Sequence, residues 1–227
     1  MLVASVMMFA EPKPLRVVVL GDDPMMTSDE ASGAVGYATQ LQPLFDGAVT
    51  VDVKTSATLL PNDPAALLEP ANKGDLVMIC KMPNDIASDE KLASDIYLEQ
   101  LLAIQQAAKK KGVKTIWLTP VCPRYYTADG TQVHRLGHTP IVIRSMCQRD
   151  LLPVVDLEKM MFDWLSAEGA ENTAAAYVAV EPASPVAAEK AAREGYALTE
   201  AGAQKVAALI ADAIRADKKN LLNKRLR

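Results

Sequence analysis

The first residues of this 227-residue chain that could carry chemistry are acidic and stand directly after an apolar segment. Arg16–Leu20 has the pattern of a short buried strand, and Gly21, Asp22 and Asp23 follow it at once. A polar turn in this place can present a nucleophile, a metal ligand or a helix cap. The turn is therefore an active site, the remains of one, or an ordinary strand end.

Short apolar runs alternate with longer helical patterns along the chain. The predicted strands are Arg16–Leu20, Val49–Val53, Leu76–Cys80, Thr115–Leu118 and Pro153–Val155; the predicted helices are Ala38–Phe45, Asp89–Lys111, Thr139–Asp150, Leu157–Glu168 and Thr199–Ala216. The strands are rich in Val, Ile and Leu without polar alternation, which is typical of strands covered on both faces. Crossover helices between them predict a three-layer α/β/α sandwich with a flavodoxin-like, mostly parallel five-stranded sheet.

Composition limits the possible partners. Half of the residues are hydrophobic and the formal net charge is −4, which argues against a nucleic-acid binder. We expect one domain over residues 15–217, followed by a basic tail, 218–227, that is a solvated helix end. Residues 1–14 resemble the rear of a signal peptide, so we expect a secreted or periplasmic protein; a flexible N-terminus on a cytoplasmic protein is the alternative. This run is too short for stable membrane insertion.

Six segments in order carry a resemblance to a known family. They are "VVVLGDDPMM", "GAVGYATQLQPLF", "GDLVMICKMPND", "LTPVCPRYY", "LPVVDL" and "LTEAGAQKVAALIADAI". Their order and spacing resemble the SGNH (GDSL-type) hydrolase superfamily, and within it the rhamnogalacturonan acetylesterase-type carbohydrate esterases. The resemblance extends over about residues 16–216 and adds the SGNH-hydrolase form of the fold to the prediction.

The resemblance implies a serine nucleophile after the first strand, with oxyanion donors from that serine, a glycine and an asparagine. It also implies an aspartate and a histidine before the last helix, which act as orienter and base. On this chain Gly36 corresponds to the glycine and Asn84 to the asparagine. The nucleophile position holds Asp23, the aspartate position holds Glu194, and the histidine position holds Ala197.

These departures indicate a protein that keeps the family fold and has lost its chemistry. A carboxylate is a poor substitute for an activated hydroxyl, and alanine accepts no proton. We therefore expect no ester hydrolysis and no cofactor. The implied ligand is a carbohydrate or an acylated saccharide, and Tyr125 and Tyr126 are the candidates for stacking on a sugar ring.

Other interpretations stay open. His134 or His138 could serve a relocated triad in an active O-acyl hydrolase, with Ser28 or Ser32 as a displaced nucleophile. Ser28 is more simply explained as a helix cap. The carboxylates Asp22, Asp23, Asp85 and Glu194 could gather around a hard cation, but the resemblance gives Asp22 and Asp85 structural roles and we predict no metal. A structural or interaction domain with a filled cleft is the remaining alternative.

Overall fold

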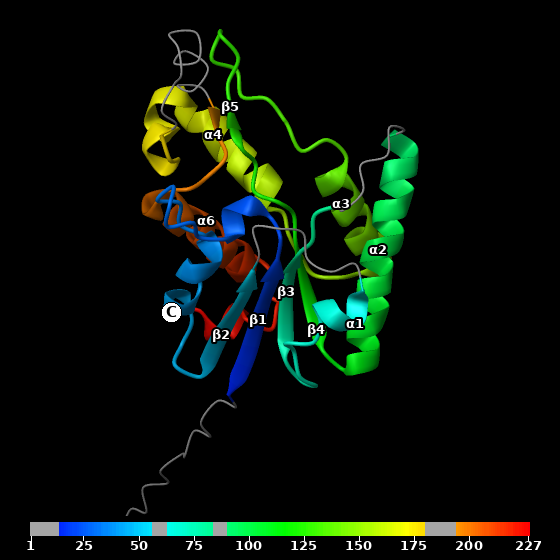
Figure 1. Cartoon of the computed structure of the whole chain (residues 1–227). Coiled ribbons are helices and arrows are strands. Elements are labelled where there is room, and N and C mark those ends of the chain that lie inside the picture. The colour runs from blue at the N-terminus through cyan, green and yellow to red at the C-terminus, as the bar shows by residue number, and fades with distance from the viewer. Residues whose placement is uncertain (1–13, 56–62, 84–89, 180–193) are drawn as a thin grey trace, which may run out of the picture.

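Five parallel strands form the central sheet, in the order β2-β1-β3-β4-β6 (Figure 1). The computed structural model describes residues 14–55, 63–83, 90–179 and 194–227. The strands are β1 (Leu15–Gly21), β2 (Val49–Thr55), β3 (Leu76–Cys80), β4 (Lys114–Leu118) and β6 (Val154–Val155). The predicted α/β class with a parallel five-stranded sheet is confirmed, and every predicted strand is present.

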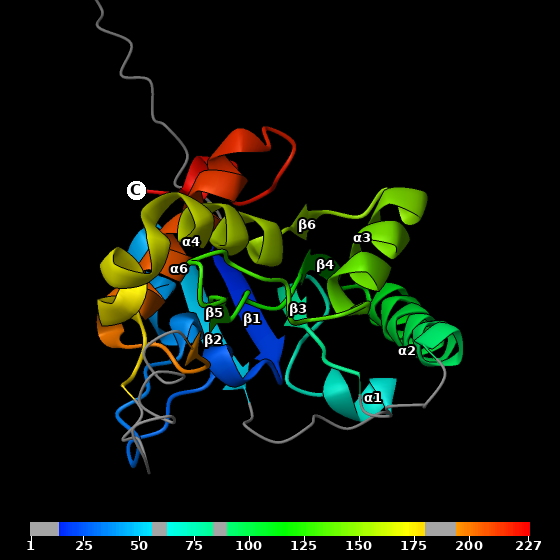
Figure 2. The ribbon, with the colours of Figure 1, turned by 90° about the horizontal axis from the view of Figure 1, so that it is seen from above.

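Helices cover both faces of the sheet (Figure 2). One face packs α1 (Pro64–Leu67), α2 (Glu90–Lys111) and α3 (Thr139–Asp150); the other packs α4 (Leu157–Thr173) and α6 (Glu200–Ala216). Successive side chains of a strand point to opposite faces, so Val17 and Val19 enter one core while Val18 and Leu20 enter the other. All four are fully or almost fully buried, which explains why β1 carries no polar alternation.

The predicted helix over Ala38–Phe45 is wrong. The chain forms two 3-10 turns there, η2 (Tyr37–Gln40) and η3 (Gln42–Leu44). Pro43 lies in the first turn of η3 and has no amide hydrogen for a continuing helix. The side chain of Gln42 instead bonds the edge of β2, donating to the carbonyl of Val49 at 3.0 Å and accepting from the amide of Val51 at 2.8 Å.

A second, antiparallel sheet pairs β5 (Arg124–Tyr125) with β7 (Glu194–Gly195). Its strands are distant in sequence, and their pairing brings the segment before α6 to the loop that follows β4. At the start of α6 the hydroxyl of Thr199 accepts from the amide of Gly202 at 3.3 Å and caps the helix. A side chain at Gly202 would begin 2.0 Å from the carbonyl oxygen of Ala176, so only glycine allows this close approach.

The basic C-terminal segment packs on the body of the protein. Leu222 is fully buried, and the side-chain amide of Asn223 caps α6, its Nδ2 donating to the carbonyls of Ile214 at 2.9 Å and Arg215 at 2.8 Å. The amide of Arg227 donates to the carbonyl of Leu44 at 2.9 Å. The prediction of a solvated helix end is therefore wrong: α6 stops at Ala216 and the tail folds back. The signal-like opening up to residue 13 lies outside the described residues.

Candidate active site

Asp23 stands where the chain leaves β1 and turns into the 3-10 turn η1 (Pro24–Met26). One carboxylate oxygen, Oδ1, accepts from the amide of Met25 at 2.9 Å, and the other, Oδ2, accepts from the amide of Val121 at 2.8 Å. Val121 belongs to the loop after β4, so the carboxylate joins the turn after β1 to a second strand end. Asp23 is only 2% exposed. A side chain at Gly21 would begin 2.0 Å from the sulfur of Met26, so a larger residue at the end of β1 would require that methionine side chain to move.

Burial dominates the ionisation of Asp23. It raises the pKa of this carboxyl from 3.8 to about 6, although the hydrogen bonds from the amides of Val121 and Met25 lower it. The negative charge of Asp22 adds a smaller rise. The two backbone amides thus stabilise the carboxylate, but they do not compensate for the loss of hydration.

The raised pKa of Asp23 predicts a pH-dependent stability. The folded protein holds this proton more tightly than the unfolded chain, so the free energy of unfolding falls as the pH rises from about 3 to about 7, through both pKa values. The expected loss is about 3 kcal/mol, since one pKa unit corresponds to about 1.4 kcal/mol. Asp23→Asn cannot titrate. The free energy of unfolding of Asp23→Asn, minus that of wild type, should therefore rise by about 3 kcal/mol as the pH rises over this range.

Urea unfolding across this pH range measures the shift. Glu69→Gln is the control, because Glu69 is exposed and its side chain makes no hydrogen bond in the described structure. Parallel pH profiles for Asp23→Asn and wild type would contradict the prediction.

Asp22 forms a buried ion pair beneath the turn. Its Oδ2 lies 2.7 Å from the ammonium of Lys81, and its Oδ1 accepts from the amide of Met82 at 2.6 Å. The same ammonium donates to the carbonyl of Met82 at 3.0 Å, and the hydroxyl of Tyr97 donates to the carbonyl of Lys81. The side chain of Lys81 is 1% exposed. The pair ties the end of β1 to the end of β3, the structural role that the resemblance implied for Asp22.

A cleft of about 310 Å³ opens beside Asp23. It is called the Asp23 cleft here, and its lining residues are Asp23, Pro24, Met25, Met82, Pro120, Val121, Pro123, Arg135, Leu136 and Tyr196. The guanidinium of Arg135 lies 4.1 Å from the centre of the Tyr125 ring. The cleft thus has mostly apolar walls, with a carboxylate, a guanidinium and a phenol as its polar groups.

The predicted oxyanion donors are not available as the resemblance implied. The amide of Gly36 donates to the hydroxyl of Ser28 at 2.9 Å, so this donor already has an acceptor. Ser28 consequently bonds a loop amide and does not cap a helix. A side chain at Gly36 would begin 2.1 Å from the carbonyl oxygen of Met26, which gives this glycine a packing role. Asn84 and Asp85 lie outside the described residues.

The segment that holds the orienter and base positions, Glu194 and Ala197, reaches the cleft through a residue that lies between these two. Glu194 lies in β7 opposite Tyr125, and Ala197 is half-buried with its carbonyl accepting from the amide of Val178 at 2.9 Å. Tyr196, between the two, lines the Asp23 cleft. Arg135 and Tyr196 were missed by the sequence reasoning. Their positions in two segments already singled out, around His134 and around Ala197, were the available signal.

Of the two tyrosines predicted to stack on a sugar, one is excluded. Tyr126 is 3% exposed and its hydroxyl donates to the carbonyl of Leu165 at 2.6 Å, so its ring belongs to the core. Tyr125 is half-buried, and the guanidinium of Arg135 covers its ring. The aromatic side chain at the cleft itself is Tyr196, which is 49% exposed.

His134 belongs to a neighbouring hollow of about 360 Å³ that shares Leu136 with the Asp23 cleft. Its Nδ1 contacts Glu158, and its ring stacks on Phe162 at 3.7 Å between centres. Arg144 binds Glu158 and, at 2.7 Å, Asp156. No hydroxyl or thiol side chain is among the described residues that line this hollow. His138 borders a different hollow, beside α2 and α3. Ser32 is exposed and bonds Asp29.

Two absences hold for the part of the chain that the structure describes. It contains no group of three or more His, Cys, Asp or Glu side chains placed to hold a metal ion. None of its helices combines the length and apolar character needed to cross a bilayer.

Comparisons with known proteins agree with the fold. No protein-family model matches the chain. Rhamnogalacturonan acetylesterase RhgT of Bacillus subtilis (strain 168) is 22% identical over 209 residues, which cover 89% of this chain and 90% of the relative. The structure of the YXIM protein of Bacillus subtilis superposes with a TM-score of 0.64 at 17% identity, over 90% of this chain and 57% of that one. The structure of the acetyl xylan esterase AlAXEase gives a TM-score of 0.55 at 16% identity, over 88% and 99%.

Proposed function

We propose that this member of the SGNH hydrolase superfamily binds an acylated carbohydrate in the Asp23 cleft and does not hydrolyse it by serine–histidine chemistry. The observation that carries the proposal is the state of Asp23. At the nucleophile position stands a buried carboxylate, and each of its oxygens already accepts a backbone amide hydrogen. The protein would then use an esterase cleft for recognition.

The chemistry of ester cleavage supports this proposal. Acyl transfer needs a nucleophile whose proton is taken by a base within hydrogen-bond reach. Asp23 has no hydroxyl, and Ala197 offers no base at the corresponding position. Removing triad members costs several orders of magnitude in rate. The amide of Gly36, bonded to Ser28, is a further donor withdrawn from the oxyanion.

Carbohydrate binding is supported by the polar groups of the cleft and by the relatives. A carboxylate that accepts two amide hydrogens keeps lone pairs for sugar hydroxyls. Arg135 supplies further donors and Tyr196 an exposed ring face. The named relatives are a rhamnogalacturonan acetylesterase and an acetyl xylan esterase, which favours an acetylated polysaccharide fragment as the ligand.

Two measurements on the wild-type protein test both halves of the proposal. Hydrolysis of a chromogenic acetate ester should stay at the buffer rate, and a fluorophosphonate probe should not label the protein. Calorimetric titration with acetylated rhamnogalacturonan or xylan oligosaccharides should show binding that Tyr196→Ala weakens. Tyr125→Phe, which keeps the ring under Arg135, serves as the matched control. Turnover that depends on the Asp23 cleft, or no binding at millimolar oligosaccharide, would overturn the proposal.

A second candidate function is hydrolysis with His134 as a relocated base. The contact of its Nδ1 with the buried carboxylate of Glu158 is the observation that favours it, because a carboxylate orients a catalytic imidazole in this way. Since no hydroxyl or thiol is among the described lining residues, the base would have to activate water. Ester hydrolysis by wild type that His134→Ala abolishes and Asp23→Ala leaves unchanged would select this candidate.

A further inference from the structure

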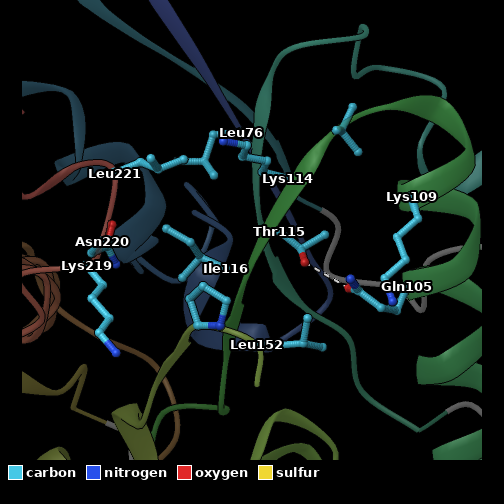
Figure 3. A pocket seen from close by; sticks show the side chains of 12 residues that line it. Leu76, Gln105, Lys109, Lys114, Thr115, Ile116, Leu152, Lys219, Asn220 and Leu221 are labelled. Atoms are coloured by element: carbon cyan, nitrogen blue, oxygen red, sulfur yellow. Dashed lines mark hydrogen bonds between the residues drawn. The ribbon is translucent and has the colours of Figure 1, made fainter. Parts of the chain in front are cut away.

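A second cleft, of about 290 Å³, called the lysine cleft here, lies at the amino ends of β3 and β4 (Figure 3). The Asp23 cleft lies at the other end of the sheet, at the carboxyl ends of the strands. The walls of the lysine cleft come from the end of α2, the start of β4, the residues before β6 and the tail after α6. The lining residues are Leu76, Gln105, Lys109, Val113, Lys114, Thr115, Ile116, Leu152, Pro153, Lys219, Asn220 and Leu221.

The interior of the lysine cleft is mainly apolar. Leu76, Val113 and Ile116 are buried and belong to the sheet and to the turn before it. Leu221, from the tail, is 51% exposed at the side of the cleft. An exposed leucine beside a hollow with apolar walls can pack against the apolar part of a bound ligand.

The charged side chains of the lysine cleft are all cationic. Lys109, Lys114 and Lys219 are exposed, and none forms an ion pair or a side-chain hydrogen bond in the described structure. They come from α2, β4 and the tail, three separate segments. Lys109 also acts electrostatically on Asp150, which does not line the cleft, but three ammonium groups without an ion pair around one hollow favour an anion there and disfavour a cation.

Two buried amides add hydrogen-bond donors. Gln105 is 7% exposed, and its Oε1 accepts from the hydroxyl of Thr115 at 2.8 Å and from the indole N–H of Trp117 at 3.1 Å. An indole nitrogen can only donate, so the oxygen of Gln105 must face it and the amide nitrogen, Nε2, must face away. In the described structure this nitrogen has no acceptor.

Asn220 repeats this arrangement on the opposite wall. It is 8% exposed, and its Oδ1 accepts from the backbone amide of Leu222 at 3.0 Å. A backbone amide can only donate, which fixes the orientation of the side chain. The Nδ2 of Asn220 therefore also remains a donor without an acceptor among the described residues. Neither amide nitrogen is among the fully buried unpaired atoms of the described structure, so each is open to water or to a ligand.

We propose that the lysine cleft binds a small amphiphilic carboxylate, the anion of a medium-chain organic acid. The carboxylate oxygens would accept from the amide nitrogen of Asn220 and be neutralised by the lysines. The chain would lie against the leucines and Ile116. Every side-chain polar group of the cleft that lacks a protein partner is a donor, and the hydroxyl proton of Thr115 is already given to Gln105. This site is separate from the Asp23 cleft and does not depend on the function proposed for it.

Calorimetric titration of the full-length protein with octanoate tests the proposal. Octanoate should bind at one site, more tightly than acetate, which lacks the chain, and than 1-octanol, which lacks the charge. Octyltrimethylammonium, with the opposite charge, should not bind. The affinity for octanoate should fall as sodium chloride is raised to about 0.5 M, because salt screens the lysine charges. Equal affinity for octanoate and 1-octanol, or no binding at millimolar octanoate, would overturn the proposal.

Two variants locate the binding in this cleft. Lys109→Gln, Lys114→Gln and Lys219→Gln combined should weaken octanoate at least about tenfold, at about 0.5–1 kcal/mol for each exposed charge. Lys110→Gln with Lys218→Gln, exposed neighbours outside the cleft, is the control with unchanged affinity. Asn220→Asp keeps the acceptor for Leu222 and replaces the donor by a negative oxygen, so it should also weaken binding. Loss of affinity in the control pair, or unchanged affinity in both cleft variants, would assign octanoate to another surface.

Discussion

Asp23→Ser combined with Glu194→Asp and Ala197→His should give measurable hydrolysis of a small acetate ester, whereas we expect none from wild type. The three changes supply a hydroxyl nucleophile, a base and the carboxylate that orients the base. Asp23→Ser alone should stay inactive, because its hydroxyl would lack a base to take the proton. The expected difference is several orders of magnitude over the single variant, the usual effect of completing a triad.

Two features of the cleft affect this outcome. Met82 lines the Asp23 cleft, so Met82→Gly, which would enlarge the cleft, is added if the triple variant is inactive. The amide of Val121 loses its acceptor when Asp23 is replaced, and it becomes free to bind water or the substrate oxygen. Initial rates against chromogenic acetate, with circular dichroism as the check on folding, measure the result. An inactive but folded quadruple variant would contradict the assignment of Asp23 and Ala197 to the catalytic positions.

Lys81→Met should lower the free energy of unfolding by about 3–5 kcal/mol, which makes it the most destabilising single change we expect. Removing the ammonium leaves the carboxylate of Asp22 buried without its counter-charge. The backbone amide of Met82 would still donate to that carboxylate, but neutral hydrogen bonds do not replace an ion pair.

The double variant Asp22→Asn with Lys81→Met separates the buried charge from simple loss of contacts. Asparagine keeps an oxygen for the amide of Met82 and removes the uncompensated charge, so the double variant should be more stable than Lys81→Met alone. Urea unfolding measures both. Lys91→Met is the control, since the Lys91–Asp95 ion pair is exposed and such pairs contribute at most about 1 kcal/mol. An effect of Lys81→Met no larger than that of Lys91→Met would contradict the expected role of the pair.

Elements that depend on local pattern were predictable from the sequence. The predicted bounds of Leu76–Cys80 and Thr139–Asp150 agree with β3 and α3 residue for residue, and the predicted helix Thr199–Ala216 agrees with α6 except that Thr199 is its cap. Strands buried on both faces and helices with one apolar stripe carry their environment in their own composition. The parallel sheet follows from their alternation.

Features that depend on contacts between distant segments were not predictable in this way. Ala38–Phe45 has a helical pattern, but it forms 3-10 turns because Pro43 interrupts it and Gln42 bonds the edge of β2. The sequence of the basic tail predicts a solvated segment. In the structure the tail bonds the carbonyl of Leu44, at the end of η3, and buries Leu222. In both cases a tertiary contact outweighs local propensity.

The sequence by itself determined that position 23 holds no serine and position 197 no histidine, the residue identities from which the proposed loss of serine–histidine chemistry is argued. Only the tertiary structure decided what stands at the candidate site instead. It showed that both oxygens of Asp23 are bonded to amides from two loops, that Tyr126 is core, and that Arg135 and Tyr196 meet at the cleft. It also brought three lysines and two side-chain amides, from segments up to more than a hundred residues apart, to the lysine cleft at the amino ends of β3 and β4. Hydrogen bonding and burial depend on spatial neighbours, and the order of residues along the chain does not specify those neighbours directly.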